Sequence, residues 1–216
     1  MTSRIYIFRH GSALSPPDLM VGRADFALSE EGRRQAEYWR DNLGLPFTLA
    51  LTSPLERAAQ TASIILSARP DNAQPRPVAE LIEISLGRWE GLSKEWIQDQ
   101  YPEEWKARGL DIINFRPPGG ESFTDLAARA WPVFRSLAHA ASGHDHTLVV
   151  THRAVIATLL QRLPGDWPDN PLDLDLPPAS LTILSVDQRG WLKYLERRFV
   201  DGSRPRDRKR PEQLKR

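Results

Sequence analysis

The chain has 216 residues, of which 40% are hydrophobic, with seven tryptophans, no cysteine and a net charge of +1. This size fits one substantial domain, and the lack of cysteine excludes disulfides, thiolate metal ligands and a cysteine nucleophile. No run approaches the roughly 18 apolar residues that a membrane helix needs. Because an apolar strand begins almost at once after Met1, we expect a cytoplasmic protein without a signal peptide.

The net charge hides an asymmetry between the two parts of the chain. Residues 197–216 hold nine Lys/Arg and three Asp/Glu, a balance of +6, so residues 1–196 carry −5. We therefore expect a folded domain over 1–196 and a basic, mobile tail over 197–216. A basic tail can bind nucleic acid, but this one is short and lacks a stacking platform of aromatics, so a solvated extension is favoured.

The first predicted strand, over 4–8, is rich in β-branched and aromatic residues and ends in Arg9-His10-Gly11. In open α/β sheets, ligands bind beyond the carboxyl ends of the strands. A guanidinium there can clamp a phosphoryl group, and an imidazole can attack phosphorus. The alternative is a solvated arginine beside a packed histidine.

Next come a helix over 29–43, capped by Ser29 and stopped by Gly44, and a strand over 47–52. Strand, helix and strand at this spacing predict a parallel βαβ unit. Ser53-Pro54-Leu55-Glu56 then has the pattern of a helix start with a capping serine. Arg57 falls in the first turn, where backbone N–H groups favour an anion; the alternative is a surface arginine.

Two carboxylates, Glu80 and Glu83, follow a proline-rich loop, and the residues alone do not choose between them. Residues 93–113 are predicted as a helix with three aromatic side chains. In the loop that follows, Ser122 and Asp125 form a capping-box pattern for another helix, which Pro132 should kink or interrupt.

A buried strand over 147–151 ends at His152, and a helix is expected over 153–163. The helix N-terminus lowers the affinity of an imidazole for a proton and favours a bound anion. Strands over 181–186 and 191–195 should close the fold as a hairpin. His144-Asp145-His146 has no third ligand at a suitable spacing, so we expect no metal site.

In this order, four separated stretches resemble the histidine phosphatase superfamily, which has the phosphoglycerate-mutase-like fold; they are 9–11, 51–57, 83–91 and 147–152. The resemblance covers most of residues 4–195. It implies an α/β fold: a three-layer sandwich with a mostly parallel central sheet flanked by helices. It also implies that His10 is the nucleophile, and that Glu83, four residues before Gly87, is the acid.

The remaining roles follow from the same resemblance. Arg9, Arg57 and His152 would bind the phosphate. The expected substrate contacts are Ser12, Arg23, Glu121 and Arg153. Arg153 stands where relatives usually have glycine, and Ser12 where they commonly have glutamate or threonine, so both positions depart from the family pattern.

The function implied is a metal-independent phosphomonoesterase, in the branch that includes alpha-ribazole phosphatases. It would act on a small phosphorylated metabolite without a cofactor, away from membranes and nucleic acid, with a homodimer as one option. A cofactor-dependent mutase is disfavoured by the short segment over 93–113. A non-catalytic phospholigand-binding protein is disfavoured because both His10 and Glu83 are present.

Overall fold

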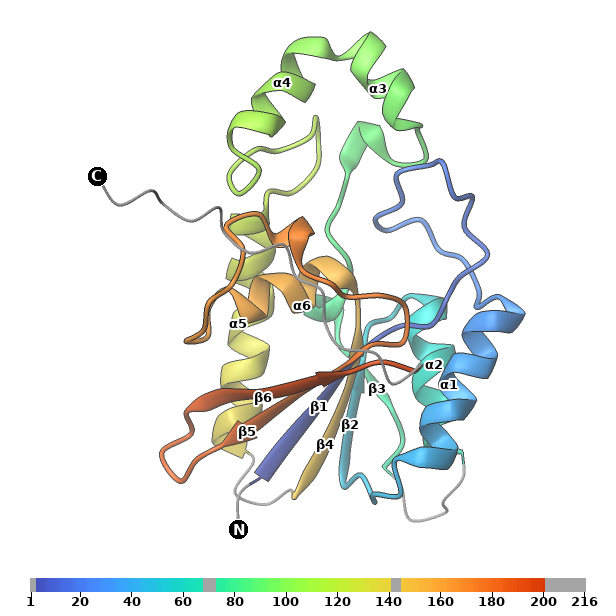
Figure 1. The fold of residues 1–216 in the computed structure, drawn as a ribbon, viewed down its shortest axis with the longest axis vertical. Coiled ribbons are helices and arrows are strands. Elements are labelled where there is room, and N and C mark those ends of the chain that lie inside the picture. Colours follow the sequence, from blue (N-terminus) through green and yellow to red (C-terminus); the bar gives the residue numbers. More distant parts are fainter. Residues whose placement is uncertain (1–2, 68–72, 141–144, 201–216) are drawn as a thin grey trace.

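A mixed six-stranded sheet forms the centre of the computed structural model, which describes residues 3–67, 73–140 and 145–200. The strand order is β3-β2-β4-β1-β5-β6. The first four of these run parallel, and β5 and β6 add an antiparallel hairpin beside β1 (Figure 1). The strands are β1 (Ser3–Arg9), β2 (Leu49–Thr52), β3 (Arg76–Pro77), β4 (His146–Thr151), β5 (Leu181–Val186) and β6 (Leu192–Arg198).

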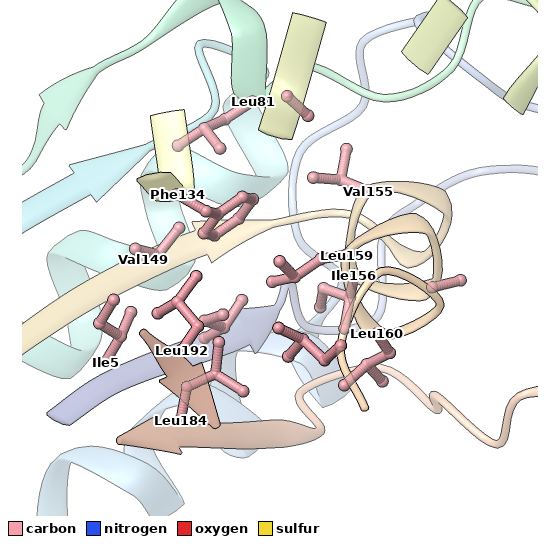
Figure 2. Close-up of a cluster of buried hydrophobic side chains, with 14 of the residues drawn as sticks. Ile5, Leu81, Phe134, Val149, Val155, Ile156, Leu159, Leu160, Leu184 and Leu192 are labelled. Atoms are coloured by element: carbon pink, nitrogen blue, oxygen red, sulfur yellow. The ribbon is translucent and has the colours of Figure 1, made fainter. Parts of the chain in front are cut away.

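Helices cover both faces of this sheet, because its central strands are apolar on both sides. In β1, Ile5 and Ile7 belong to the core cluster with residues of α5 (Phe123–Ala140) and α6 (Arg153–Leu160). Figure 2 shows Ile5 in this cluster, near Val149 of β4. The alternate residues Tyr6 and Phe8 pack under α1 (Glu30–Asn42) and α2 (Glu56–Leu66). The period of two along a strand thus builds two cores and the predicted three-layer sandwich.

Two short helices, α3 (Lys94–Gln100) and α4 (Pro102–Leu110), lie beyond the carboxyl ends of the strands (Figure 1). We call this pair the cover. The prediction of one helix over 93–113 is wrong at Tyr101, which ends α3 and precedes α4. Pro102 causes the break, since it lacks an N–H and disfavours helical backbone in the residue before it. Short 3-10 turns span Ala79–Leu81, Gly87–Trp89 and Pro171–Asp173.

Helix starts test the local predictions further. Ser29 caps α1 as expected, accepting a hydrogen bond from the Gly32 N–H. Ser53 does not cap α2, which begins at Glu56. The Glu56 N–H instead donates to Asp25 Oδ1 at 2.8 Å, so a distant loop supplies the cap.

The capping box at the start of α5 is confirmed by reciprocal hydrogen bonds between Ser122 and Asp125. Pro132 lies inside α5 without interrupting it. Beyond the proline, Phe134 and Leu137 are buried in the core, and this packing holds the second half of the helix in place.

The end of the folded region also differs from the prediction. Arg197 and Arg198, assigned to the tail, belong to β6 and pair with β5. Arg197 is buried and donates to the Asp175 carbonyl, which explains why it is not part of a mobile segment. Residues 201–216 of the predicted tail lie outside the described residues. Within the described ranges, no helix is long and apolar enough to cross a membrane.

The turn after β1 depends on a close approach between two glycines. A Cβ atom on Gly32 would lie 2.0 Å from the Ser12 carbonyl oxygen, and one on Gly11 would lie 2.5 Å from the Gly32 oxygen. The N-terminus of α1 can therefore pack on the chain that follows His10 only if both residues lack a side chain.

We expect Gly32→Ala to lower the free energy of unfolding by about 1–3 kcal/mol, because the added methyl group forces the two backbones apart. Urea unfolding measures this. Gly109→Ala is the matched control, since a Cβ there, in α4, meets no atom within 4 Å; it should be neutral or stabilising. Equal unfolding midpoints for Gly32→Ala and wild type would contradict the packing argument.

Candidate active site

A cavity of about 910 Å³ lies between the carboxyl ends of the strands and the cover. Arg9, at the end of β1, and Arg153, at the start of α6, line it together with Glu83. The cover and the segments beside it contribute an apolar wall that includes Trp89, Trp105 and Phe115. The cavity is therefore lined by charged side chains at the edge of the sheet and by aromatic side chains on the side of the cover.

His10 follows β1 and is buried, with a relative exposure of 8%. Its Nδ1 lies 2.7 Å from the Gly11 carbonyl oxygen. Because a carbonyl only accepts, Nδ1 carries the proton, and Nε2 of the neutral ring keeps its lone pair. Burial lowers the His10 pKa well below its ordinary value, and the charges of Arg9 and Arg57 lower it further. The ring is thus neutral, with a lone pair on Nε2.

His152 lies beside His10, with 5.1 Å between the ring centroids. It follows β4, is fully buried, and its Nε2 is 2.7 Å from the Ser53 hydroxyl. Its Nδ1 is buried without a hydrogen-bond partner among the described residues. Burial lowers the pKa of His152 well below its ordinary value, and the neighbouring His10 contributes in the same direction. Two neutral imidazoles therefore share the floor of the site.

Arg57 enters the site from the first turn of α2 and is 3% exposed. Its Nη1 donates to the Ala24 carbonyl at 2.8 Å and its Nη2 to the Gly22 carbonyl at 2.7 Å. Asp25 is 4.0 Å away, at the limit of an ion pair. Carbonyl dipoles orient this guanidinium without neutralising it, so it keeps a positive charge to offer an anion.

Arg9 is held in the same way, since its Nη1 donates to the Leu176 carbonyl. Its Nε is buried and has no partner among the described residues. Burial, with the charge of Arg153 as the second cause, lowers the pKa of Arg9 to about 10. Arg9 therefore stays charged at neutral pH, and an unused donor remains in the site.

Glu83 is the buried carboxylate of the site. Its Oε1 accepts from the Ile84 N–H at 2.8 Å, and its Oε2 lies 3.4 Å from the Ala154 N–H. Burial raises the pKa of Glu83 above the ordinary value, although these N–H groups oppose the shift. Glu80 is exposed and does not line the cavity. Of the two carboxylates left open by the sequence, only Glu83 is placed to exchange a proton in the cavity.

Glu121 and two arginines fix the backbone at Glu83. The Nη2 of Arg23 is 2.7 Å from Glu121 Oε1, and that of Arg129 is 3.0 Å from Glu121 Oε2. Both arginines also donate to the Glu83 carbonyl, at 3.0 and 2.9 Å. Arg23 and Glu121, expected to contact substrate, both hold the loop that carries Glu83; Glu121 also lines the cavity, whereas Arg23 does not. Arg129 was missed, because no local pattern on α5 marks it.

Glu90 supports Arg57 from a distance. Its carboxylate accepts hydrogen bonds from the N–H groups of three successive residues, Gly22, Arg23 and Ala24. Two of these residues supply the carbonyls that hold Arg57. Glu90 therefore has a structural role, since it holds the loop that orients Arg57.

Ser12 does not line the cavity, although it was expected to contact substrate. Its N–H donates to Gln35 Oε1, and its carbonyl accepts from Ser29. Ser12 therefore joins the turn after β1 to α1. Across the described ranges, no group of three or more His, Asp or Glu side chains could hold a metal ion; His146 is a residue of β4, and His144 lies outside those ranges.

The two buried imidazoles predict how stability depends on pH. Both pKa values are lower in the folded state, so below about pH 6.5 the unfolded chain binds protons that the folded chain does not. Stability is full above this pH and falls below it. His10→Gln should reduce the slope of unfolding free energy against pH there by up to about 1.4 kcal/mol per pH unit. Denaturant unfolding between pH 4.5 and 7.5 measures this.

The control is His139→Gln, which replaces an exposed histidine on α5. It should leave the slope as in the wild type. A slope that His10→Gln does not change would show that the His10 ring takes up its proton in the folded protein.

Residues 5–196 match the histidine phosphatase superfamily, branch 1. The chain is 32% identical over 192 residues to the adenosylcobalamin/alpha-ribazole phosphatase of Salmonella typhimurium, covering 87% of this chain and 88% of that protein. It is 29% identical over 208 residues to the phosphoglycerate mutase of Schizosaccharomyces pombe, covering 91% and 95%. The structure of the alpha-ribazole phosphatase from Shigella flexneri superposes with a TM-score of 0.78 at 25% identity, covering 89% and 94%. The chain belongs to the histidine phosphatase superfamily, branch 1.

Proposed function

We propose that this protein is a phosphomonoesterase that hydrolyses a small phosphorylated metabolite through a phosphohistidine at His10. One observation carries the proposal. The His10 ring is neutral, and its Nε2 has no hydrogen-bond partner among the described residues. It lies beside Arg9 and Arg57, and among those residues no carboxylate comes closer to either guanidinium than Asp25 does to Arg57, at 4.0 Å. A nucleophile next to uncompensated cations is suited to attack on a phosphate dianion.

In the first step, Nε2 of His10 forms a bond to phosphorus while the bond between phosphorus and the ester oxygen breaks. Arg9, Arg57 and His152 stabilise the negative charge on the other three phosphoryl oxygens. Glu83 acts here in its protonated form, which burial favours by raising its pKa, and gives its proton to the departing oxygen. The products are the free alcohol and a phosphohistidine, and Glu83 is left as a carboxylate.

In the second step, water attacks the same phosphorus. Glu83 takes a proton from the water as the new oxygen–phosphorus bond forms, and the phosphorus–nitrogen bond breaks. The electron pair of that bond returns to Nε2 of His10, while Nδ1 keeps its proton and still donates it in a hydrogen bond to the Gly11 carbonyl. Inorganic phosphate leaves, and both residues regain their starting protonation states.

A mutase is the second candidate, because the Schizosaccharomyces pombe relative bears that name. The chain covers 95% of that relative, so overall length does not separate the two activities. Phosphatases among both the sequence relatives and the solved structures favour hydrolysis. The two activities differ only in the acceptor of the phosphoryl group, which is water in one case and a second hydroxyl in the other.

We expect His10→Gln to lower turnover of 4-nitrophenyl phosphate by roughly 10³-fold or more, as loss of a nucleophile does. When wild-type protein is quenched during turnover in the presence of a chelator, it should carry an acid-labile phosphoryl label. The variant should lack this label. His139→Gln is the control and should keep both. With 3-phosphoglycerate, release of inorganic phosphate supports hydrolysis, whereas 2-phosphoglycerate would identify a mutase.

Glu83→Gln should affect esters according to their leaving groups. For propyl phosphate, whose alkoxide must be protonated as it leaves, we expect kcat to fall by about 10²- to 10⁴-fold. For 4-nitrophenyl phosphate, formation of the phosphohistidine should change little, because its leaving group needs no proton; single-turnover release of 4-nitrophenol measures this step. Glu80→Gln, which alters an exposed carboxylate three residues earlier, is the control. Equal losses on both esters would contradict a proton-donor role.

A further inference from the structure

Arg153 is the first residue of α6 and lines the cavity beside Arg9 and Glu83. Its Nη2 donates to the Leu172 carbonyl and lies 3.4 Å from the Leu174 carbonyl oxygen. Its Nε and Nη1 have no hydrogen-bond partner among the described residues, and none of the described carboxylates forms an ion pair with it. The guanidinium is thus held by hydrogen bonds from Nη2 alone, and Nε and Nη1 are left to donate to a ligand.

The charges around Arg153 favour an anion in the cavity. Its charge is the second cause, after burial, of the lowered pKa of Arg9, so the two guanidiniums repel each other. Burial also lowers the pKa of Arg153, and Glu83, Asp173 and Asp175 offset this only in part. An anionic group between cations relieves such repulsion, and a planar guanidinium binds carboxylates and phosphates with two parallel hydrogen bonds.

Arg153 differs in position from most of the residues that would bind the transferred phosphoryl group. His10, Arg57 and His152 do not line the cavity; Arg9 and Arg153 do, so Arg153 borders the space left for the alcohol part of a substrate. Two other cations, Lys94 and Arg108, line the cavity from the cover. Arg153 is therefore a cation on the strand side that the chemistry proposed for His10 does not use.

We propose that Arg153 binds a second anionic group, a carboxylate or a phosphate, on the alcohol part of the substrate. The inference rests on the proposed phosphatase function and narrows its substrates to phosphomonoesters of anionic alcohols. Arg153 is then a specificity-determining residue. Its contacts with the Leu172 and Leu174 carbonyls fix the orientation in which the free donors meet that group.

Three esters with the same three-carbon chain test the proposal: propyl phosphate, 3-(phosphonooxy)propanoate and propane-1,3-diyl bisphosphate. Arg153→Gln removes the charge but keeps an N–H donor for the Leu172 carbonyl. We expect its KM to rise about 10- to 100-fold for the two anionic esters and less than about 3-fold for propyl phosphate. The anionic ester whose KM rises more shows whether Arg153 prefers a carboxylate or a phosphate.

Arg34→Gln, on the exposed side of α1, is the charge-matched control and should leave all three KM values unchanged. Arg153→Lys, which keeps the charge but loses the planar fork, should lie between wild type and Arg153→Gln. It also serves as the second variant where Arg153→Gln fails to fold. Equal losses on all three esters would assign Arg153 to holding the loop at 172–174 and overturn the proposal, as would no loss on any.

Binding to His10→Gln protein, measured by calorimetry with and without Arg153→Gln, provides a readout that does not need turnover. The proposal predicts the same 10- to 100-fold loss for the anionic esters alone. The proposal would be overturned if each ester bound with the same affinity to the His10→Gln protein and to the His10→Gln/Arg153→Gln protein. A wild-type protein that hydrolyses neither these esters nor 4-nitrophenyl phosphate would refute the proposed function, while the binding measurement would still decide the role of Arg153.

Discussion

Hydrogen bonds from arginine to backbone carbonyls are the interaction on which the site depends. Arg57 and Arg9 are buried or nearly so, yet backbone dipoles orient them, and within the described part of the chain their nearest ion pair is the 4.0 Å contact between Arg57 and Asp25. A close ion pair would satisfy the same donors but would neutralise the charge. The free-energy cost of burying these cations is thus not offset by a close ion pair within the protein. In the proposed reaction, the phosphate dianion of the substrate offsets it. Burial lowers the pKa of His10 and so keeps its ring neutral, and the same two charges act in the same direction.

The rest of the fold supplies those carbonyls and keeps them still. Glu90 holds the loop that carries the Gly22 and Ala24 carbonyls, and the Glu121 network holds the loop of Glu83. These two carboxylates hold the elements that carry the charged groups of the site. Removing either would loosen one of these loops, and a misplacement of about 1 Å can lower a reaction rate by roughly 10²-fold.

The sequence was most informative where the evidence is local or periodic. The apolar runs that end in Arg9-His10 and before His152 were read correctly as strands, as was the Ser29 cap. The first strand and the strand at 47–52 were expected to pair, but β4 lies between β1 and β2, and both pair with it in parallel. Long-range partners were not visible. Ser53 looked like a helix cap, but its hydroxyl contacts His152, 99 residues away. Arg129 contacts Glu83 across 46 residues. Such pairings are set by the packed fold, and no spacing in the chain encodes them; Glu83 was chosen over Glu80 only through the family resemblance.

The cover is attached to the domain in an unusual way. Helix α4 contains no buried residue, and Trp105 packs on the fully buried Trp89 with 5.9 Å between ring centroids. Trp89 in turn belongs to the turn just after the loop of Glu83, at the base of the cavity wall. The residues of α4 are therefore free to change without disturbing either hydrophobic core. Substitutions in this one short helix would therefore alter a wall of the cavity while His10, Arg57 and Glu83, which other elements carry, keep their positions.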